Sequence, residues 1–379
     1  MSINPIEFYN ALENNGVNFF TGVPDSLLKQ FCLCLDDKKD KIKHIIAANE
    51  GNAIALAAGY HLGTGDVPLV YMQNSGLGNA INPILSLCDK DVYSIPMLII
   101  IGWRGEPGVI DEPQHFKQGR VQLQLLESMN INYCIIDKDT NDIKKNIENA
   151  VNKAKSINEP FALLVKKDTF SNYHSQSLKS KLHSQLMQRE CALEVLMHKF
   201  PQNSIIVSTT GKTSREIFEI RDKIDGDHSK DFLTVGSMGH CSSIALGIAI
   251  SNPNKKVICI DGDGALLMHL GSLSTISKIK PNNFYHILLN NEVHESVGGQ
   301  ETSIKHINVK KLMESHYYNK VLSIDSKEKI IDSISDLLRC NGPNFLEIKV
   351  KPGSRENLGR PSIKPKDNKD NFMNFIKNS

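Results

Sequence analysis

One stretch in the second half of the chain constrains the fold more than any other. Residues 257–260 form a short apolar, β-branched run, which is typical of a buried strand. A tight loop of sequence DGDG follows, then a helix-like stretch over 265–278 and a second apolar run over 285–289. This order predicts a βαβ unit in a parallel sheet. In such a unit both loops open at the same sheet edge, where ligands of open α/β folds bind.

The polar residues of these two loops suit a magnesium ion. Asp263 lies in the first loop, and Asn290 and Asn291 end the second apolar run. Carboxylate and amide oxygens are hard ligands that Mg²⁺ accepts, while its other positions stay open to water and phosphate groups. Gly262 and Gly264 let a diphosphate approach the backbone closely, and the start of the following helix favours an anion.

Net charge and apolar content exclude several functional classes. The chain has 379 residues, of which 44 are basic and 42 acidic, so its net charge of +2 indicates neither a nucleic-acid partner nor a membrane partner. The N-terminus has no signal-peptide pattern, and the apolar runs are too short to span a bilayer. The eight cysteines include no CxxC pair. They predict reduced, mostly buried thiols in a cytoplasmic protein, and neither a disulfide framework nor a zinc site.

Strand and helix patterns alternate along both halves of the chain. They predict an α/β fold with two tandem domains, each a mainly parallel sheet flanked by helices. The first domain is expected over 1–170 and the second over 188–379, with a polar, Ser-rich linker at 171–187. No middle domain fits between them.

Two glycine-containing segments approach known phosphate-binding motifs but lack a required residue. Residues 73–79 are expected to form a glycine-rich loop, and the segment GLGNAI there has Ile81 where the dinucleotide-binding pattern GxGxxG needs its last glycine. The GKT segment that begins at Gly211 has Ile206 where a P-loop needs its first glycine. Backbone N–H groups and Lys212, at the start of the next helix, can still hold a phosphate group.

Glu50 stands at the start of a helix that is rich in Ala and Gly. A glutamate at a helix N-terminus is usually a partner of the helix dipole or a capping group. A carboxyl group near apolar walls also has a raised pKa, which suits proton transfer. The residues alone leave both interpretations open.

Motifs along nearly the whole chain resemble those of the thiamine-diphosphate-dependent 2-oxo acid decarboxylases. They are TGVPDS, ANEGNAIALAAGYHL, MQNSGLGNAINP, GWRGEPG with DEPQH, GSMGH, GSRENLGRP, and GDG separated by residues 265–289 from NN. Within this family the resemblance is strongest to the phosphonopyruvate decarboxylases, and it extends to the sulfopyruvate decarboxylases. The usual middle domain of the family is missing here.

The resemblance implies that the chain binds thiamine diphosphate, and it implies a role for particular residues. Glu50 is implied to contact the aminopyrimidine ring and to assist removal of the C2 proton of the thiazolium ring. Met238, in the GSMGH motif, is implied to hold the cofactor in a bent shape. The other implied cofactor-binding residues are Gly211, Lys212, Thr213, Gly236, Ser237, Gly262, Asp263, Gly264, Ala265 and Asn291.

The same resemblance implies the ligands of a Mg²⁺ ion that holds the diphosphate. They are the side chains of Asp263 and Asn291 and the backbone carbonyl of Val293. If the motif aligns one residue earlier, Asn290 is the metal ligand in place of Asn291.

The substrate implied by the resemblance is a small, anionic 2-oxo acid held by polar residues of several loops. The candidates are Thr21, Asp25, Ser26, Arg104, His115, Arg355 and Arg360. Arginine can bind an oxyanion through two parallel hydrogen bonds, whereas Asp25 would repel it unless protonated or anchoring a donor. His115, in a long polar loop, is either a proton donor or anion contact, or a surface histidine. Asp25 or Ser26 could also cap the helix that follows.

The resemblance further implies an assembly of several copies. Members of this family build each site between the first domain of one chain and the second domain of another, so a homodimer or a larger homo-oligomer is expected. Two alternatives stay open. One is another thiamine-diphosphate enzyme, such as a sulfopyruvate decarboxylase or a carboligase, and the other is a non-enzymatic binding protein that keeps the fold.

Overall fold

A computed structural model describes residues 2–38, 42–175 and 185–378. The chain divides into two compact units, Met1–Ser180 with Val297–Gln300, and Lys181–Ser296 with Glu301–Ser379. Residues 176–184 of the expected linker lie outside the described part of the chain. The domain boundaries at 170 and 188 therefore stay predictions.

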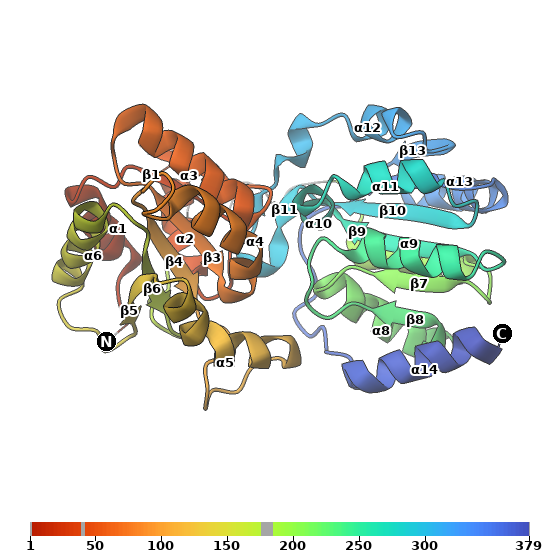
Figure 1. The fold of residues 1–379 in the computed structure, drawn as a ribbon. Helices are drawn as coiled ribbons and strands as arrows, with labels where there is room; N and C mark the ends of the chain where they lie inside the picture. The colour runs from red at the N-terminus through yellow and green to blue at the C-terminus, as the bar shows by residue number, and fades with distance from the viewer. Residues whose placement is uncertain (1, 39–41, 176–184, 379) are drawn as a thin grey trace. The chain divides into compact units, whose positions relative to one another are not determined.

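The first unit contains a six-stranded parallel sheet. Its strands are β1 (Phe19–Gly22), β2 (Lys43–Ile46), β3 (Leu69–Gln73), β4 (Leu98–Gly102), β5 (Asn132–Ile136) and β6 (Phe161–Val165). Their order across the sheet is β2-β1-β3-β4-β6-β5, and every neighbouring pair is parallel (Figure 1). Parallel neighbours need crossover connections, which helices supply here. The predicted parallel sheet of the first domain is confirmed.

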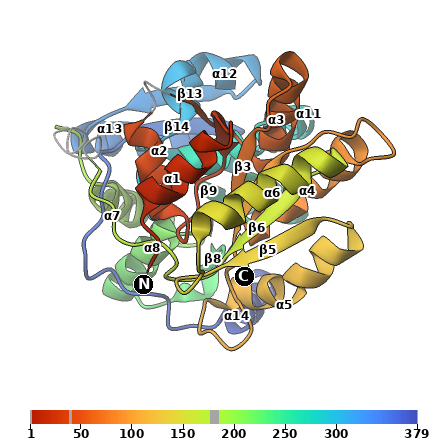
Figure 2. The ribbon, with the colours of Figure 1, turned by 90° about the vertical axis from the view of Figure 1, so that its left-hand side faces the viewer.

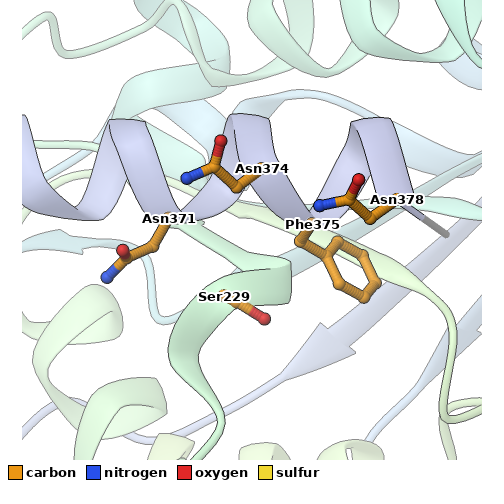
Figure 3. Close-up of a pocket in the computed structure, with 5 residues that line it drawn as sticks. All are labelled: Ser229, Asn371, Asn374, Phe375 and Asn378. Carbon is orange, nitrogen blue, oxygen red and sulfur yellow. The ribbon is translucent and has the colours of Figure 1, made fainter.

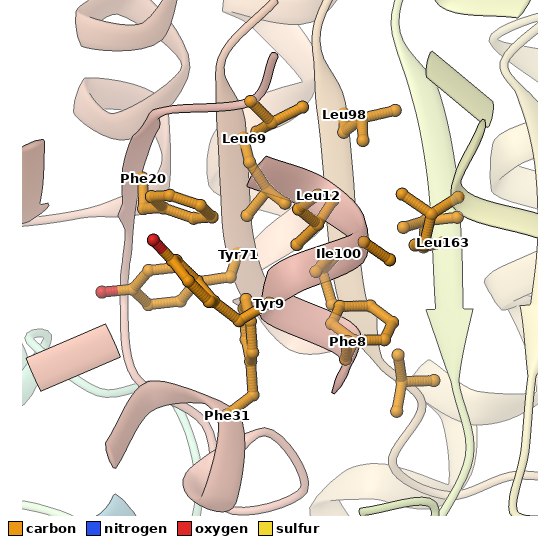
Figure 4. Close-up of a cluster of buried hydrophobic side chains, with 14 of the residues drawn as sticks. Phe8, Tyr9, Leu12, Phe20, Phe31, Leu69, Tyr71, Leu98, Ile100 and Leu163 are labelled. Carbon is orange, nitrogen blue, oxygen red and sulfur yellow. The ribbon is translucent and has the colours of Figure 1, made fainter. Parts of the chain in front are cut away.

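Helices cover both faces of this sheet. They are α1 (Pro5–Asn14), α2 (Lys29–Asp37), α3 (Glu50–Thr64), α4 (Leu77–Pro83), α5 (Pro113–Ser128) and α6 (Ile143–Ile157). Helices α1, α2 and α6 lie together over one face (Figure 2), where Phe8 packs with Leu69 and Tyr71 of β3 (Figure 4). Val70 and Met72 of the same strand pack with α3 and α4 on the other face. Burial on both faces explains why these strands are continuously apolar.

The second unit contains another six-stranded parallel sheet. Its strands are β7 (Ile205–Ser208), β8 (Asp231–Leu233), β9 (Val257–Gly262), β10 (Phe284–Asn290), β13 (Lys320–Ile324) and β14 (Asn344–Lys349). Their order is β13-β14-β10-β9-β7-β8, again with parallel neighbours. Two short strands, β11 (Val293–His294) and β12 (Gln300–Glu301), lie outside this sheet. The βαβ unit predicted from residues 257–293 is confirmed.

Helices also cover both faces of the second sheet. They are α7 (Arg189–Lys199), α8 (Lys212–Ile224), α9 (Cys241–Ser251), α10 (Asp263–Met268), α11 (Ser272–Ile279), α12 (Val309–Ser315), α13 (Lys327–Arg339) and α14 (Pro365–Asn378). Ile258 and Ile260 of β9 pack with α7, α8 and α13, and Val257 and Cys259 pack with α9, α11 and α14. Successive residues of one strand thus serve two separate cores.

Helix α3 begins at Glu50 because Asn49 caps it. The backbone of Asn49 is extended, with φ of −150°, and its side chain accepts a hydrogen bond from the N–H of Asn52 at 2.9 Å. This is the usual geometry of an asparagine N-cap. The helix ends at Gly65, which has a left-handed φ of 79° and donates its N–H to the carbonyl of His61. The expected helix start at Glu50 is confirmed.

Three local expectations are wrong. The glycine-rich segment 73–79 is not a loop, because it forms the 3-10 turn Asn74–Gly76 and the start of α4, whose Leu77 is buried in the core. The expected helix over 265–278 is two helices, since His269 leaves the helical conformation with φ of −133°. The expected cap of α2 by Asp25 or Ser26 is absent, because the N-cap is Leu28 and makes no side-chain bond.

Two further expectations concern the whole described chain. All eight cysteines are free, and most of them are buried, as their distribution predicts. None of the helices in residues 2–38, 42–175 and 185–378 combines the length and apolar character that a membrane crossing requires.

Candidate active site

Glu50 is a buried acid that a neutral amide holds in place. It is 5% exposed, and Nδ2 of Asn79 donates a hydrogen bond to its Oε2 at 2.8 Å. Burial raises the pKa of Glu50, and the hydrogen bond from Asn79 opposes this only in part. A carboxyl group of this kind can hold or share a proton closer to neutral pH, which is the property that its expected role needs.

Gly76 leaves the space that the side chain of Glu50 occupies. A Cβ atom placed on Gly76 would lie 2.6 Å from Cδ of Glu50 and closer still to Oε1. Contacts this short do not occur for real Cβ atoms, so a side chain at this position would displace the carboxyl group. The glycine-rich segment therefore serves Glu50, a function that the sequence reasoning missed.

Thr21 and Asp25 lie at the carboxyl end of β1, and both are fully buried. Asp25 accepts hydrogen bonds from Nε2 of Gln73 at 2.6 Å and from the N–H of Leu27 at 2.9 Å. Burial raises the pKa of Asp25 despite these bonds. Oγ1 of Thr21 has no hydrogen-bond partner among the described residues. It is therefore a polar atom at this strand end with bonding capacity to spare.

Arg104 follows β4 and is engaged by an acid. Its Nε donates to Oδ2 of Asp111 at 2.8 Å, its Nη2 pairs with Oδ1 of Asp111, and its Nη1 donates to Oγ of Ser26 at 2.7 Å. A two-pronged pair of this kind is strong and oriented. The structure thus brings together two expected substrate residues, Ser26 and Arg104, and adds Asp111, which offsets part of the positive charge.

His115 lies in the first turn of α5 and not in a loop, because that helix begins at Pro113. It is 7% exposed, so the alternative of a surface histidine is wrong. Desolvation lowers the pKa of His115 to about 4, and the positive charge of Arg104 acts in the same direction. The imidazole is therefore neutral at pH 7 and suits a neutral hydrogen-bonding role more than a cationic contact to an anion.

Asp263 is a buried acid at the carboxyl end of β9. It follows Gly262, which lies in register with Leu289 of β10, so Asp263 and the Asn290–Asn291 pair stand at the same sheet edge. Oγ1 of Thr302 donates to Oδ2 of Asp263 at 2.5 Å. Burial raises the pKa of Asp263 to about 6, although the bond from Thr302 opposes this shift.

Asn291 is oriented by Glu295. Its Nδ2 donates to Oε2 of Glu295 at 3.0 Å, and its Oδ1 accepts from the N–H of Val293 at 3.2 Å. With the amide nitrogen fixed on an acid, the amide oxygen is left to act as a ligand. Asn290 makes a matching pair of bonds, because its Nδ2 donates to Oε1 of Glu347 at 2.7 Å and its Oδ1 accepts from the N–H of Glu292 at 3.2 Å.

Glu295 also contacts the first residues of α8 and α7. Its Oε1 accepts from Nζ of Lys212 at 2.9 Å, and its Oε2 accepts from Nη1 of Arg189 at 2.8 Å. Burial alone would raise the pKa of Glu295, but the charges of Arg189 and Lys212 lower it. Gly211, with φ of 97°, and the buried Thr213 flank Lys212 at the start of the helix. The sequence reasoning missed Glu295, although it stands four residues after Asn291.

The turn that contains Met238 has an unusual backbone. Ser237 has a positive φ of 44°, and Gly236 and Gly239 on either side are also positive. A serine in this region is strained, which is a common property of binding loops. A Cβ atom placed on Gly264 would lie 3.5 Å from Cε of Met238 and 3.1 Å from the ring of His294. Met238 thus lies next to the GDG segment, where β9 passes directly into α10.

Arg355 of the C-terminal segment contacts acids of α7 and α8. Nε of Arg355 donates to Glu190 at 3.0 Å, and its Nη2 pairs with Glu219. Arg360 is exposed. Their roles in substrate binding stay predictions.

A surface hollow of about 290 Å³ lies along α14 (Figure 3). It is lined by Ser229, Asn371, Asn374, Phe375 and Asn378. This lining contains no acid, base or thiol, so the hollow does not offer the proton chemistry found around Glu50.

Two protein-family descriptions match the chain. "Thiamine pyrophosphate enzyme, N-terminal TPP binding domain" matches residues 7–126, and "Thiamine pyrophosphate enzyme, C-terminal TPP binding domain" matches residues 224–348. The chain belongs to the thiamine pyrophosphate enzyme family. The two matches and the two sheets confirm the predicted architecture without a middle domain.

Several relatives are similar over nearly their full length. A phosphonopyruvate decarboxylase of Streptomyces viridochromogenes is 31% identical, over 97% of this chain and 93% of its own. One of Streptomyces hygroscopicus is 32% identical, over 96% and 92%. A sulfopyruvate decarboxylase of Methanosarcina acetivorans is 26% identical, over 95% and 94%.

The residues of each unit fit the cofactor of this family. In the second unit, the groups that lower the pKa of Asp263 are a hydroxyl and backbone N–H groups, and none of them is a cation. A divalent ion would neutralise this buried carboxylate. In the first unit, Glu50 offers a buried carboxyl that can share a proton with a ring nitrogen.

Proposed function

We propose that this protein decarboxylates 3-phosphonopyruvate to phosphonoacetaldehyde and CO₂, with thiamine diphosphate and Mg²⁺, as a step of phosphonate biosynthesis. The relatives named phosphonopyruvate decarboxylase, at 31% and 32% identity, support the substrate. The structural observation that carries the proposal is the buried carboxyl group of Glu50, with its raised pKa, at the start of α3.

The residues of the chain divide the work of the reaction. Thiamine diphosphate, when bound, supplies an electron sink for the pair left as CO₂ departs. Asp263, Asn291 and the carbonyl of Val293 would hold the Mg²⁺ ion. Glu50 would share its proton with the aminopyrimidine ring. The hydroxyl of Thr21, which has no partner in the described chain, would donate to an oxygen of the substrate.

The direct test is the variant Glu50→Gln. An amide cannot exchange a proton as a carboxyl group does, so we expect kcat to fall by about 100-fold or more. Binding of thiamine diphosphate, followed by calorimetry, should persist. The matched control is Glu7→Gln, which changes an exposed glutamate in the first turn of α1. Decarboxylation at the parental rate by Glu50→Gln would contradict the proposal.

A second candidate is decarboxylation of 3-sulfopyruvate, favoured by the relative from Methanosarcina acetivorans. The two substrates differ in charge, because a phosphonate is close to dianionic at neutral pH and a sulfonate is a monoanion. Release of CO₂ should be compared for 3-phosphonopyruvate, 3-sulfopyruvate and pyruvate under identical conditions. We expect the highest kcat/KM for the phosphonate, and a higher value for the sulfonate would replace the proposed substrate.

We also propose a homodimer or a larger closed homo-oligomer, with each site formed between two chains. Helix α3 supports this, because Leu56 and Leu62 are 38% and 70% exposed on it. A mixing experiment tests the arrangement. If Glu50 and Asp263 of one site come from different chains, Glu50→Gln and Asp263→Asn chains refolded together should recover about a quarter of the parental activity, because half of random dimers then hold one intact site. No recovery would indicate sites within single chains.

The eight free cysteines support a location in the cytoplasm, where thiols stay reduced. Fractionation of the producing cells would test this.

A further inference from the structure

A second cluster of metal-binding side chains lies inside the second unit, beneath the loop that carries Asp263. Cys259 and Asp261 are two residues apart on β9, so their side chains share one face of the sheet. His286 of β10 is in register with Cys259. All three residues are at most 1% exposed. One potential ligand atom from each lies within 4.8 Å of the others.

Two polar atoms in this cluster are left without hydrogen-bond partners in the described structure. Nε2 of His286 and Oδ2 of Asp261 face each other at 3.5 Å. The other oxygen of Asp261 accepts from the N–H of Gly262 at 2.9 Å. Buried polar atoms without hydrogen-bond partners are uncommon, so an ion or a proton between these two atoms would account for their facing one another.

The second ring nitrogen of His286 is already occupied. Its Nδ1 lies 3.2 Å from the hydroxyl oxygen of Tyr318, which is 4% exposed. An N–H at Nδ1 that donates to this hydroxyl leaves a lone pair on Nε2, directed at the gap. Histidines that bind metals in proteins are usually fixed in this way by a partner on their other nitrogen.

A fourth candidate ligand is Cys241, the first residue of α9. Its Sγ lies 3.5 Å from Sγ of Cys259. Zinc bonds are about 2.3 Å long to sulfur and about 2.1 Å long to nitrogen or oxygen. In a tetrahedral site, two sulfur ligands are therefore about 3.8 Å apart, and a nitrogen and an oxygen ligand are about 3.4 Å apart. In the structure, the two sulfur atoms are 3.5 Å apart, and Nε2 of His286 is 3.5 Å from Oδ2 of Asp261, so both distances are near these values.

We propose that Cys259, Asp261 and His286, with Cys241 as the nearest fourth ligand, form a structural site for a zinc ion. The thiolate of Cys259 and the carboxylate of Asp261 together neutralise a divalent ion, and Cys241 would add one negative charge when it binds as a thiolate. Sulfur and imidazole ligands select zinc over magnesium, which prefers the oxygen ligands at Asp263. The ion would join β9, β10 and α9 directly below the diphosphate loop. This proposal does not depend on the proposed enzymatic function.

The experiment measures metal in the purified full-length protein. After expression with added zinc and dialysis, we expect about one zinc per chain by mass spectrometry. Cobalt-substituted protein should show an absorption band for charge transfer from thiolate to cobalt, which oxygen ligands alone cannot produce. The band should persist in Asp263→Asn and in Cys88→Ser, a control for a buried cysteine of the first unit. It should weaken in Cys259→Ser and in His286→Gln, and it should be lost in the double variant Cys241→Ser with Cys259→Ser.

The parental protein decides the outcome even if a variant fails to fold. Less than a tenth of a zinc ion per chain, together with no charge-transfer band, would overturn the proposal. A proton shared between His286 and Asp261 would then occupy the gap. A band that disappears in Asp263→Asn but persists in Cys259→Ser would also overturn it, because the metal would then lie at the diphosphate loop.

Discussion

The two sheets have the same strand order and different chemistry at their carboxyl edges. The six strands of the second sheet can be numbered one to six in chain order, as β7, β8, β9, β10, β13 and β14. Read from β8, the order of these strands across the sheet is then 2-1-3-4-6-5. The first sheet has the same order. Glu50 follows the second strand of the first sheet, whereas Asp263 and Asn291 follow the third and fourth strands of the second.

The side chains that contact the buried acids determine how the pKa values of these acids differ between the two units. In the first unit, neutral amides of Asn79 and Gln73 hold Glu50 and Asp25, so burial dominates and both acids have raised pKa values. In the second unit, Glu295 is held by two cations and has a lowered pKa. The comparison teaches that burial raises the pKa of an acid in either unit, as at Glu50 and Asp263, and that a pair of cations reverses the shift at Glu295.

The largest expected effect comes from Asp263→Asn, which tests whether the second edge depends on a metal. The amide removes the anionic ligand, so we expect Mg²⁺-dependent activity to fall by about 1,000-fold or more. Decarboxylation and calorimetric titration with Mg²⁺ measure this. If the variant retains both its decarboxylation rate and its Mg²⁺ affinity, the carboxyl edge of the second sheet does not depend on a metal at Asp263.

The next effect distinguishes the neighbouring asparagines. Asn291→Ala should weaken Mg²⁺ binding by about 10- to 100-fold, because it removes a ligand. The matched control is Asn290→Ala, which removes the hydrogen bond to Glu347 and should lower thermal stability with little change in metal affinity. The opposite result would assign the ligand to Asn290.

A smaller effect is expected in the first unit from Gly76→Ala. The added Cβ would meet the carboxyl group of Glu50, so we expect kcat to fall by about 10-fold with a smaller change in KM. Gly78→Ala is the matched control, because a Cβ at that position meets no atom within 4 Å. Equal rates for the two variants would show that the position of Glu50 is not critical.

The last effect is on stability and not on activity, and it is a pH dependence of the metal-free protein. The pKa of Asp263 is about 6 when folded and 3.8 as the ordinary value, so protonation favours the folded state. The stabilisation is complete below pH 3.8 and is lost as the pH rises through about 6, by about 3 kcal/mol. With chelator present, Asp263→Asn should therefore melt at a higher temperature than the parent at pH 8, and the difference should shrink towards pH 5. A constant difference would contradict this.

The strands, and the placement of Asp263 and the Asn290–Asn291 pair at one sheet edge, were predicted from the sequence because both depend on local patterns. Buried strands such as β9 are continuous apolar runs, and the separation between GDG and NN survives in the register of β9 and β10. The segment 73–79 was misjudged because Gly and Asn have low helix propensity, which the packing of Leu77 overrides.

Other features were out of reach because they depend on neighbouring strands. Cys259 and His286 are distant in sequence, and only the pairing of β9 with β10 places them side by side. A search for closely spaced metal ligands therefore finds no zinc site. The contact of Asp111 with Arg104 likewise depends on how the chain turns after β4.

The hydroxyl of Thr302 has a consequence for how magnesium would enter. It donates to Oδ2 of Asp263, while the N–H of Thr302 donates to the carbonyl of Glu292 after β10. Thr302 thus ties the end of β9 to the turn after β10. At the proposed magnesium site an incoming cation would exchange its water for an oxygen that already has a partner, so the speed of loading would depend on this one hydroxyl as well as on ion concentration.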